Sequence, residues 1–421
     1  MRILVSMLVL VFVSQGLTFA QDARSPVHLS GLIKEALNNN PQILAAKARY
    51  EAARARVAFF RNVPDPMVEY GYDKIIPSMI GADAAKPMKT LSVTQRIPFP
   101  TKLFLERKAA RQEMDAQKQD YEETRQRVIE QVKDAYASLF VAQRKIAFTK
   151  DDFELAGQMA KAAEVRYSAN RDSQIDLLRA QAEQEKIMVQ QKEFEQDRVI
   201  AVSLLASLLN KAPQDLGDID THENAKGEDL SEENVIKRIK QDRPELKSFR
   251  AILDQTRTKY SLSKQSLLPD ITLTYQHQEQ NGSFGRGQWA GMVGFTIPLW
   301  FWGKQAPEIV EARADLRAAQ ADYQAEENTA IFEGRSALAK VKAAREVVEL
   351  YEKGILPRAE SVVVTDRVAY EASTGDFTEY IAAFKALRDF QMEYAQALAG
   401  LAVAKADLDR AIGGDIVSKG E

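Results

Sequence analysis

The sequence has 421 residues, a formal net charge of −3 and no cysteine. Because charges of both signs are interspersed, the composition excludes a polybasic nucleic-acid surface, and the lack of cysteine excludes a disulfide framework and a thiol-attached lipid. Abundant Ala, Glu, Gln, Lys and Arg, with few Gly and Pro, indicate long helices rather than compact domains.

The first residues are typical of an export signal. Arg2 precedes an apolar run over 3–12, and Thr18-Phe19-Ala20 ends in a small residue suited to cleavage. We therefore predict a signal peptide over 1–20. The apolar run is too short to span a bilayer, and no later run of about twenty apolar residues follows, so we expect no membrane-spanning helix.

The two halves of the chain repeat one plan at a constant offset. Three pairs carry it, Pro41 with Pro244, Tyr167 with Tyr370 and Asn210 with Gly413, since 244 − 41, 370 − 167 and 413 − 210 all equal 203. This offset predicts a first repeat over 21–212, a linker over 213–243, a second repeat over 244–413 and a polar tail over 414–421.

Each repeat is expected to contain a short helix, two strands and a long helix. The short helices are predicted over 29–61, with Ser30 as the cap, and over 244–267. The first long helix, over 102–167, contains no proline and would measure roughly 100 Å at 1.5 Å per residue. Apolar residues spaced four and three apart along it predict a supercoiled seam with a second stripe beside it. The predicted seam residues are Val128, Val132, Ala135, Leu139, Ala142 and Ile146. Its counterpart over 307–370 is interrupted by Gly334, Gly354 and Pro357.

Four segments alternate apolar and polar residues as strands do: 67–73, 90–97, 271–277 and 289–297. Each repeat thus contributes one hairpin. Aromatic side chains near the strand ends fit the girdles of a membrane barrel, namely Tyr70, Tyr72, Tyr275, Trp289, Trp300 and Trp302. Alternation alone also fits a soluble hairpin packed on helices.

Short motifs recur where strands meet helices and at the far turns. Ile97-Pro98-Phe99-Pro100 with Lys102 matches Ile297-Pro298-Leu299-Trp300 with Gly303-Lys304, and the turns near Asn170 and Gly375 also match. With these marks, nearly the whole chain after the signal resembles the outer-membrane efflux protein family typified by TolC, and more closely its heavy-metal branch, the CzcC and CusC kind.

The resemblance implies a mainly helical fold with membrane strands, in which a long antiparallel helical barrel joins four strands per chain in a trimeric twelve-stranded outer-membrane barrel. Four strands cannot close a barrel alone, and open edges are not tolerated in lipid, so oligomers are also expected on physical grounds. The implied function is a passive outer-membrane conduit that extends into the periplasm. Its implied partners are a periplasmic adaptor (membrane fusion protein), an inner-membrane pump of the resistance-nodulation-division type and outer-membrane lipid, with no cofactor and no nucleic acid.

The resemblance also assigns residues at the periplasmic end. Asp176 and Glu379 match at the repeat offset, since 379 − 176 = 203, and are candidates for a charged aperture, with solvated surface acids as the alternative. The candidate adaptor-contacting turn residues are Tyr167, Asn170, Ser173, Tyr370, Gly375 and Asp376.

No catalytic or metal-binding constellation is visible in the sequence. The three histidines, His28, His222 and His277, are widely scattered. A lone His277 is expected to be a solvated strand residue, and Met67, Met79 and Met88 to serve packing or the surface. The competing functions are a periplasmic coiled-coil adaptor or structural protein and, third, an enzyme on a helical scaffold. Metal ions, drugs, dyes and polypeptides remain open as cargo.

Overall fold

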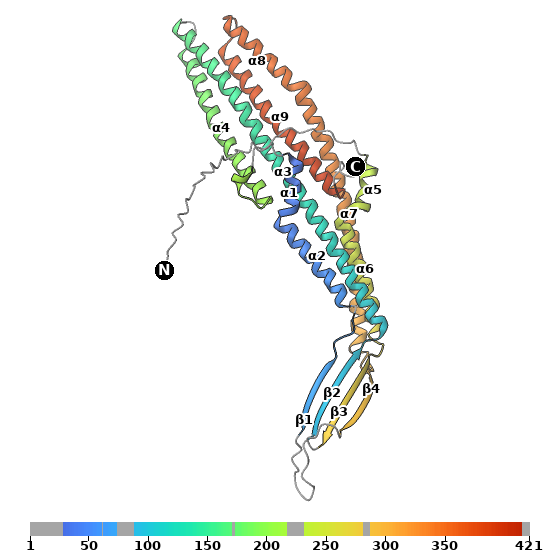
Figure 1. The fold of residues 1–421 in the computed structure, drawn as a ribbon. Coiled ribbons are helices and arrows are strands. Elements are labelled where there is room, and N and C mark those ends of the chain that lie inside the picture. Colours follow the sequence, from blue (N-terminus) through green and yellow to red (C-terminus); the bar gives the residue numbers. More distant parts are fainter. Residues whose placement is uncertain are drawn as a thin grey trace, which may run out of the picture.

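The computed structural model describes residues 28–60, 62–73, 88–170, 173–216, 231–280 and 287–414. The predicted signal peptide, Met79 and His222 lie outside these residues, as do parts of the predicted linker and tail. Long helices run side by side and a four-stranded sheet extends from one end of them (Figure 1). None of the helices that the structure describes combines the length and the apolar character needed to cross a lipid bilayer.

The expected first helix over 29–61 is in fact two helices, α1 (Leu29–Asn39) and α2 (Pro41–Phe59). Asn40 separates them, because its side chain accepts a hydrogen bond from the Gln42 amide and caps α2. Its side-chain amide also donates to the carbonyl of Leu208, at 2.9 Å. The predicted cap at Ser30 is wrong, since α1 begins at Leu29 after His28.

The first long helix is confirmed: α3 (Pro100–Ser168) runs unbroken for 69 residues. Its counterpart consists of α7 (Gln305–Leu350), a π-helical turn (Tyr351–Ile355) and α8 (Leu356–Glu371). The interruption falls beside Pro357, which lacks an amide hydrogen to continue the α-helical ladder. Gly334 does not interrupt α7. It admits Ile239 of α5 (Glu232–Asp242), whose Cδ1 would clash with a Cβ at this position.

The duplication is visible in the helix bounds. Three helix pairs match at the repeat offset: α4 (Gln174–Leu208) with α9 (Phe377–Ala411), α1 with α5 (Glu232–Asp242), and the starts of α2 and α6 (Pro244–Gln265), since 377 − 174, 232 − 29 and 244 − 41 all equal 203. The segment expected as a linker therefore contains α5, which belongs to the repeat. A short 3₁₀ turn (Pro213–Asp215) follows α4.

The matched turns share one backbone conformation. Asn170 and Ser373 both have positive φ, 54° and 64°, as do Asn210 and Gly413, 54° and 82°. The far turn of the second repeat was expected at Gly375, but its left-handed residue is Ser373. Asparagine and glycine tolerate this region better than serine does.

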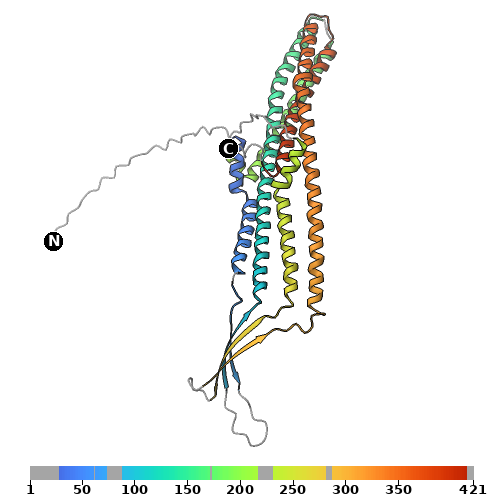
Figure 2. The ribbon, with the colours of Figure 1, turned by 90° about the vertical axis from the view of Figure 1, so that its right-hand side faces the viewer.

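The strands form one antiparallel sheet in the order β1 (Met67–Asp73), β2 (Met88–Ile97), β3 (Ile271–Gln280) and β4 (Gln288–Phe295). Both predicted hairpins are confirmed, and β2 pairs with β3 to join the repeats. Among the described residues, β1 and β4 each pair on one side only. The sheet turns away from the long axes of the helices (Figure 2).

Three apolar clusters hold the helices together. One joins α1 and α4 to α3, where the predicted seam residues Val128, Val132, Ala135 and Leu139 are all buried. A second joins α5, α7 and the end of α9, and a third lies toward the far end among α3, α4, α8 and α9. The third cluster thus packs the two long hairpins against each other.

Candidate functional site

The register of the sheet sorts its side chains onto two chemically different faces. Residues directly opposite each other in neighbouring strands point the same way, so the pairing of Val68, Val93 and Tyr275 places them on one face. That face is exposed and apolar; it also carries Tyr70, Leu91, Leu273, Trp289, Val293 and Phe295. The opposite face carries hydroxyl and amide side chains, namely Thr90, Ser92, Thr94, Thr272, Thr274, Gln276 and Gln278.

All six aromatic residues assigned to girdles are exposed. Tyr70, Tyr72, Tyr275 and Trp289 share the apolar face by register, and the Tyr275 and Trp289 rings stack at 5.1 Å between centroids. Trp300 and Trp302 lie beyond β4, edge to face at 5.7 Å, where the sheet meets the helices. The aromatic side chains thus occur at the strand–helix junction and along the apolar face.

His277 is not the solvated residue that the sequence predicted. It lies on the apolar face, is 8% exposed and stacks on Trp289 with ring centroids 3.9 Å apart. Its Nε2 is 3.4 Å from Oε1 of Glu279, which is also buried. Among the described residues, no three His, Cys, Asp or Glu side chains gather as a metal site.

At the end far from the sheet, α4 and α9 begin with matching caps. The Ser173 hydroxyl accepts from the Ile175 amide at 3.0 Å, and the Asp376 carboxylate accepts from the Thr378 amide at 3.0 Å. These two candidate contact residues therefore also fix the helix starts. The sequence match at offset 203 extends to them, since 376 − 173 = 203.

Asp176 and Glu379 occupy the first turns of these two helices. Asp176 is half-buried with its Oδ1 3.7 Å from Arg179, whereas Glu379 is exposed. Arg179 also donates to the Thr378 hydroxyl at 3.4 Å, so the two first turns are adjacent. A carboxylate at a helix N-terminus is favoured by the helix dipole, which supplies a structural reason for both acids.

The turn residues differ in exposure. Tyr167, Asn170 and Ser173 are exposed, but Tyr370 is 1% exposed and packs against Phe377 and Tyr380. Arg166 lies over the Tyr370 ring at 4.5 Å and donates to its carbonyl at 2.7 Å. The side chain of Tyr370 therefore supports the turn from inside and offers no contact surface in this chain.

A buried charged cluster behind the tip was missed by sequence reasoning. Arg388 of α9 donates to Glu183 of α4 at 2.7 Å, and Lys385 binds the same carboxylate at 2.9 Å. Burial alone would raise the pKa of Glu183, but these hydrogen bonds hold it below its usual value. Asp152 of α3 is 6% exposed and its Oδ2 accepts no hydrogen bond from the described residues. Burial raises the pKa of Asp152 to about 7.

Asp152→Asn should stabilise the protein above neutral pH. An Asp152 carboxyl that titrates near 7 when folded and near 3.8 when unfolded makes the folded state lose stability as the pH rises from about 4 to 7. Near pH 7.5 we expect a gain of about 1–3 kcal/mol from removing the buried charge, and little gain at pH 4. Thermal unfolding followed by circular dichroism at both pH values measures it. The control is Asp151→Asn, an exposed neighbour that should change neither value; a wild-type pH profile in Asp152→Asn would refute the expectation.

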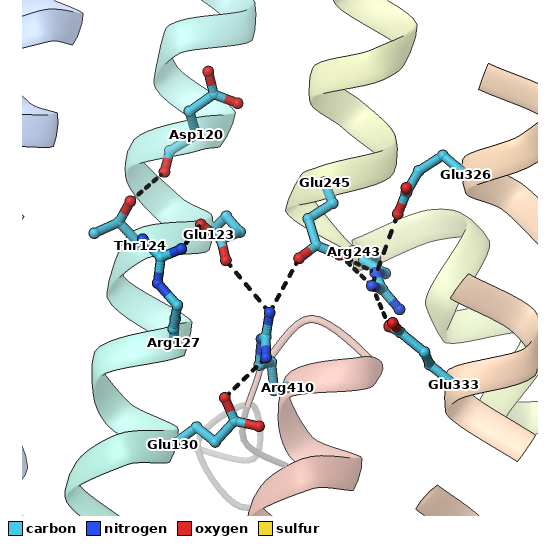
Figure 3. Close-up of polar contacts among 10 residues, drawn as sticks. All are labelled: Asp120, Glu123, Thr124, Arg127, Glu130, Arg243, Glu245, Glu326, Glu333 and Arg410. Atoms are coloured by element: carbon cyan, nitrogen blue, oxygen red, sulfur yellow. Dashed lines mark hydrogen bonds and ion pairs between the residues drawn. The ribbon is translucent and has the colours of Figure 1, made fainter. Parts of the chain in front are cut away.

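A second cluster lies at the waist, where α3, α6, α7 and the end of α9 meet (Figure 3). Arg243, 5% exposed, binds Glu245 and Glu333, the latter at 2.6 Å, with Glu326 3.8 Å away. Arg410 lies between α3 and α6, 3.0 Å from Glu130, 3.5 Å from Glu123 and 3.4 Å from Glu245. The two arginines thus connect both repeats through five glutamates.

The waist cluster combines repeat symmetry with one asymmetry. Glu123 and Glu130 of α3 correspond to Glu326 and Glu333 of α7, since 326 − 123 and 333 − 130 both equal 203. The positions of Arg243 and Arg410, however, are Asn40 and Ser207 in the first repeat. Burial raises the pKa of Glu123, Glu130 and Glu326, and the neighbouring arginines offset part of that rise: Arg127 and Arg410 at Glu123, Arg410 at Glu130 and Arg243 at Glu326.

Nearby, the turn after α9 seats against the start of α6. Gly413 has φ 82°, and a Cβ there would lie 2.7 Å from the backbone of Asp242. Only glycine adopts this positive φ without strain and also leaves room for the backbone of Asp242. The turn therefore carries the end of α9, with Arg410, directly onto the α5–α6 junction.

Known proteins are similar to this chain over nearly its whole length. Residues 32–211 and 235–414 each match the outer membrane efflux protein family. Cobalt-zinc-cadmium resistance protein CzcC of Cupriavidus metallidurans is 20% identical over 400 residues, which cover 94% of this chain and 92% of that protein. Outer membrane protein TolC of Vibrio cholerae is 22% identical over 424 residues, covering 96% and 94%. A crystal structure of CusC shares the fold with a TM-score of 0.80 at 16% identity, covering 92% of each chain.

Proposed function

The chain belongs to the outer membrane efflux protein family and is an outer-membrane channel protein, and from this premise we propose that three copies form one duct for heavy-metal cations. The observation that carries the proposal is the two-faced sheet. Its apolar face is exposed along all four strands, with Val68, Tyr275 and Val293 each more than half exposed. A soluble hairpin packed on helices would bury that face, so lipid is the occupant that fits.

The stoichiometry follows from the open edges of the sheet. Strands β1 and β4 each lack one neighbour among the described residues, and an unpaired edge is not tolerated in lipid. Three sheets of four strands close a barrel of even strand number. In that barrel the hydroxyl and amide face lines the lumen and offers a polar path, on which Glu69 and Arg96 are charged.

The helices extend this path through the periplasm. The unbroken α3 is roughly 100 Å long at 1.5 Å per residue, so the tip turns lie far from the sheet. There a periplasmic adaptor is proposed to contact the exposed residues Tyr167, Asn170, Ser173 and Asp376 and the half-buried Gly375. Through this adaptor an inner-membrane pump of the resistance-nodulation-division type supplies energy. The duct itself contributes a passage and no catalysis.

The cargo is proposed from chemistry and from one relative. CzcC is named for cobalt, zinc and cadmium resistance, and the proposed aperture of this chain is acidic. Three copies would place six carboxylates, from Asp176 and Glu379, in the first turns of the helices around one axis. A ring of carboxylates attracts cations.

Asp176→Asn with Glu379→Gln should lessen cation preference and block by multivalent metal ions in planar-bilayer recordings. The effect should be largest at low salt, because exposed charges are screened beyond roughly 8–10 Å at physiological ionic strength. The matched control is Glu164→Gln with Glu371→Gln, which removes two exposed acids at the same end of the molecule. Equal cation preference in wild type, double mutant and control would rule out the aperture.

A further inference from the structure

The joint between sheet and helices is built twice in the sequence. A Pro-Asp pair precedes the first strand of each hairpin, as Pro64-Asp65 and as Pro269-Asp270. A lysine stands where the second strand of each hairpin leads into a long helix, Lys102 in the first repeat and Lys304 in the second. The duplication therefore supplies two aspartates and two lysines at equivalent places.

One of these joints is closed within the chain. Asp270 is 5% exposed. Its carboxylate forms ion pairs with Lys102 at 2.8 Å and Arg96 at 2.7 Å, and it accepts a hydrogen bond from the Phe99 amide at 3.3 Å. Lys102 also donates to the Leu268 carbonyl at 2.8 Å. This joint ties the first repeat to the second, at the place where β2 pairs with β3 and α3 packs on α6.

In the other joint, the aspartate and the lysine form no ion pair with any described residue. Asp65 is exposed, and among the described residues its carboxylate has no hydrogen bond or ion pair. Lys304 is exposed as well, with no carboxylate partner in the part of the chain that the structure describes. Asp65 leads into β1 and Lys304 follows β4, so they flank the two outer strands of the sheet.

We propose that Lys304 of each copy binds Asp65 of the partner subunit and so repeats, between chains, the contact that Lys102 and Asp270 make within one chain. The inference rests on the proposed trimer, in which β4 lies beside the next β1 as β2 lies beside β3. Asp65 and Lys304 have opposite charges, and neither has a side-chain ion pair with another described residue.

The proposed ion pair between Lys304 and Asp65 of the partner subunit is called the clasp here. The clasp is weaker than the contact of Lys102 and Arg96 with Asp270 within one chain. Arg96, which gives Asp270 its second ion pair, corresponds to Thr296 in the motif that ends each hairpin, Ile97-Pro98 against Ile297-Pro298. Thr296 carries no charge. The ion pair between chains therefore has one cation per aspartate, whereas Asp270 within the chain has two.

The test uses the absence of native cysteine. In Asp65→Cys with Lys304→Cys, a short bismaleimide applied to outer membranes should link chains to each other and give species of two and three chains but none larger. The matched control, Lys102→Cys with Asp270→Cys, should link only within one chain, seen as an internal peptide cross-link by mass spectrometry.

A charge exchange provides the second readout. Asp65→Lys alone and Lys304→Asp alone should each lose most of the heat-resistant oligomer on gels, and the two together should restore it. If the native protein has the mass of three chains and yet neither cross-linking nor charge exchange behaves this way, the clasp is wrong. If the native protein is a single chain, the proposed trimer fails and the clasp with it.

Discussion

Arg243→Ala is expected to destabilise the protein by about 3–5 kcal/mol, the usual cost of removing one partner from a buried ion pair. Arg243 is 5% exposed and binds Glu245 and Glu333. Its removal leaves Glu326 and Glu333 without the guanidinium that they face, while Arg410 and Arg127 still face the glutamates of α3. The change should also loosen the contact between α6 and α7, because Arg243 precedes α6 directly and its side chain binds Glu245 of α6 and Glu333 of α7.

Thermal unfolding of the detergent-solubilised protein measures the effect. The control is Arg335→Ala, which breaks an ion pair with Glu232 in which both side chains are 57% exposed and should cost less than about 1 kcal/mol. A second variant, Arg243→Ala with Glu333→Gln, should recover part of the loss, since one uncompensated charge is removed. Equal unfolding midpoints for Arg243→Ala and Arg335→Ala would show that the waist cluster does not hold the repeats together.

The regular parts of the fold were predictable because they are periodic. The offset of 203 gave the duplication, alternation gave the strands, and spacings of three and four gave the seam of α3. The break between α1 and α2 was missed although it has a local signal, since Asn40 is a preferred N-cap residue and Pro41 is favoured at the first helical position. The contact without a local signal is the one from the Asn40 amide to the Leu208 carbonyl, 168 residues away in sequence.

The charged clusters were missed for a related reason. Arg410 and Glu130 are separated by 280 residues, and acids on long helices normally face solvent. A signal did exist, since Glu123 and Glu130 recur as Glu326 and Glu333 at the repeat offset. Asp152 follows the exposed Asp151 and was indistinguishable from it by composition. Asp152 is buried because this side of α3 packs against other helices, which a sequence pattern does not show.

The positions of the two candidate aperture acids were predicted from the sequence. The offset correctly paired the helix starts, and the structure shows both acids in first turns, where the helix dipole also favours them. Whether they line a passage depends on symmetry-related copies. The conductance experiment on Asp176 and Glu379 therefore tests the arrangement of three copies around one axis.

The membrane role of the sheet rests on adjacent residues that point in opposite directions. Val93 lies on the apolar face between Val68 and Tyr275, whereas the Thr94 hydroxyl lies 3.2 Å from that of Thr274 on the polar face. An arginine on the lipid face near mid-bilayer costs about 2–4 kcal/mol in each chain, and a lumen-facing one costs little. Three copies multiply that cost within one barrel.

The most direct measurement is the amount of heat-resistant oligomer recovered from outer membranes for Val93→Arg and for Thr94→Arg. The two variants add the same charge at neighbouring positions of β2 and differ only in the face that carries it. We predict that Val93→Arg is largely lost from the outer membrane and that Thr94→Arg is recovered at close to the wild-type amount. Equal recovery of the two variants, or recovery of the wild-type protein as a single chain without detergent, would contradict the account.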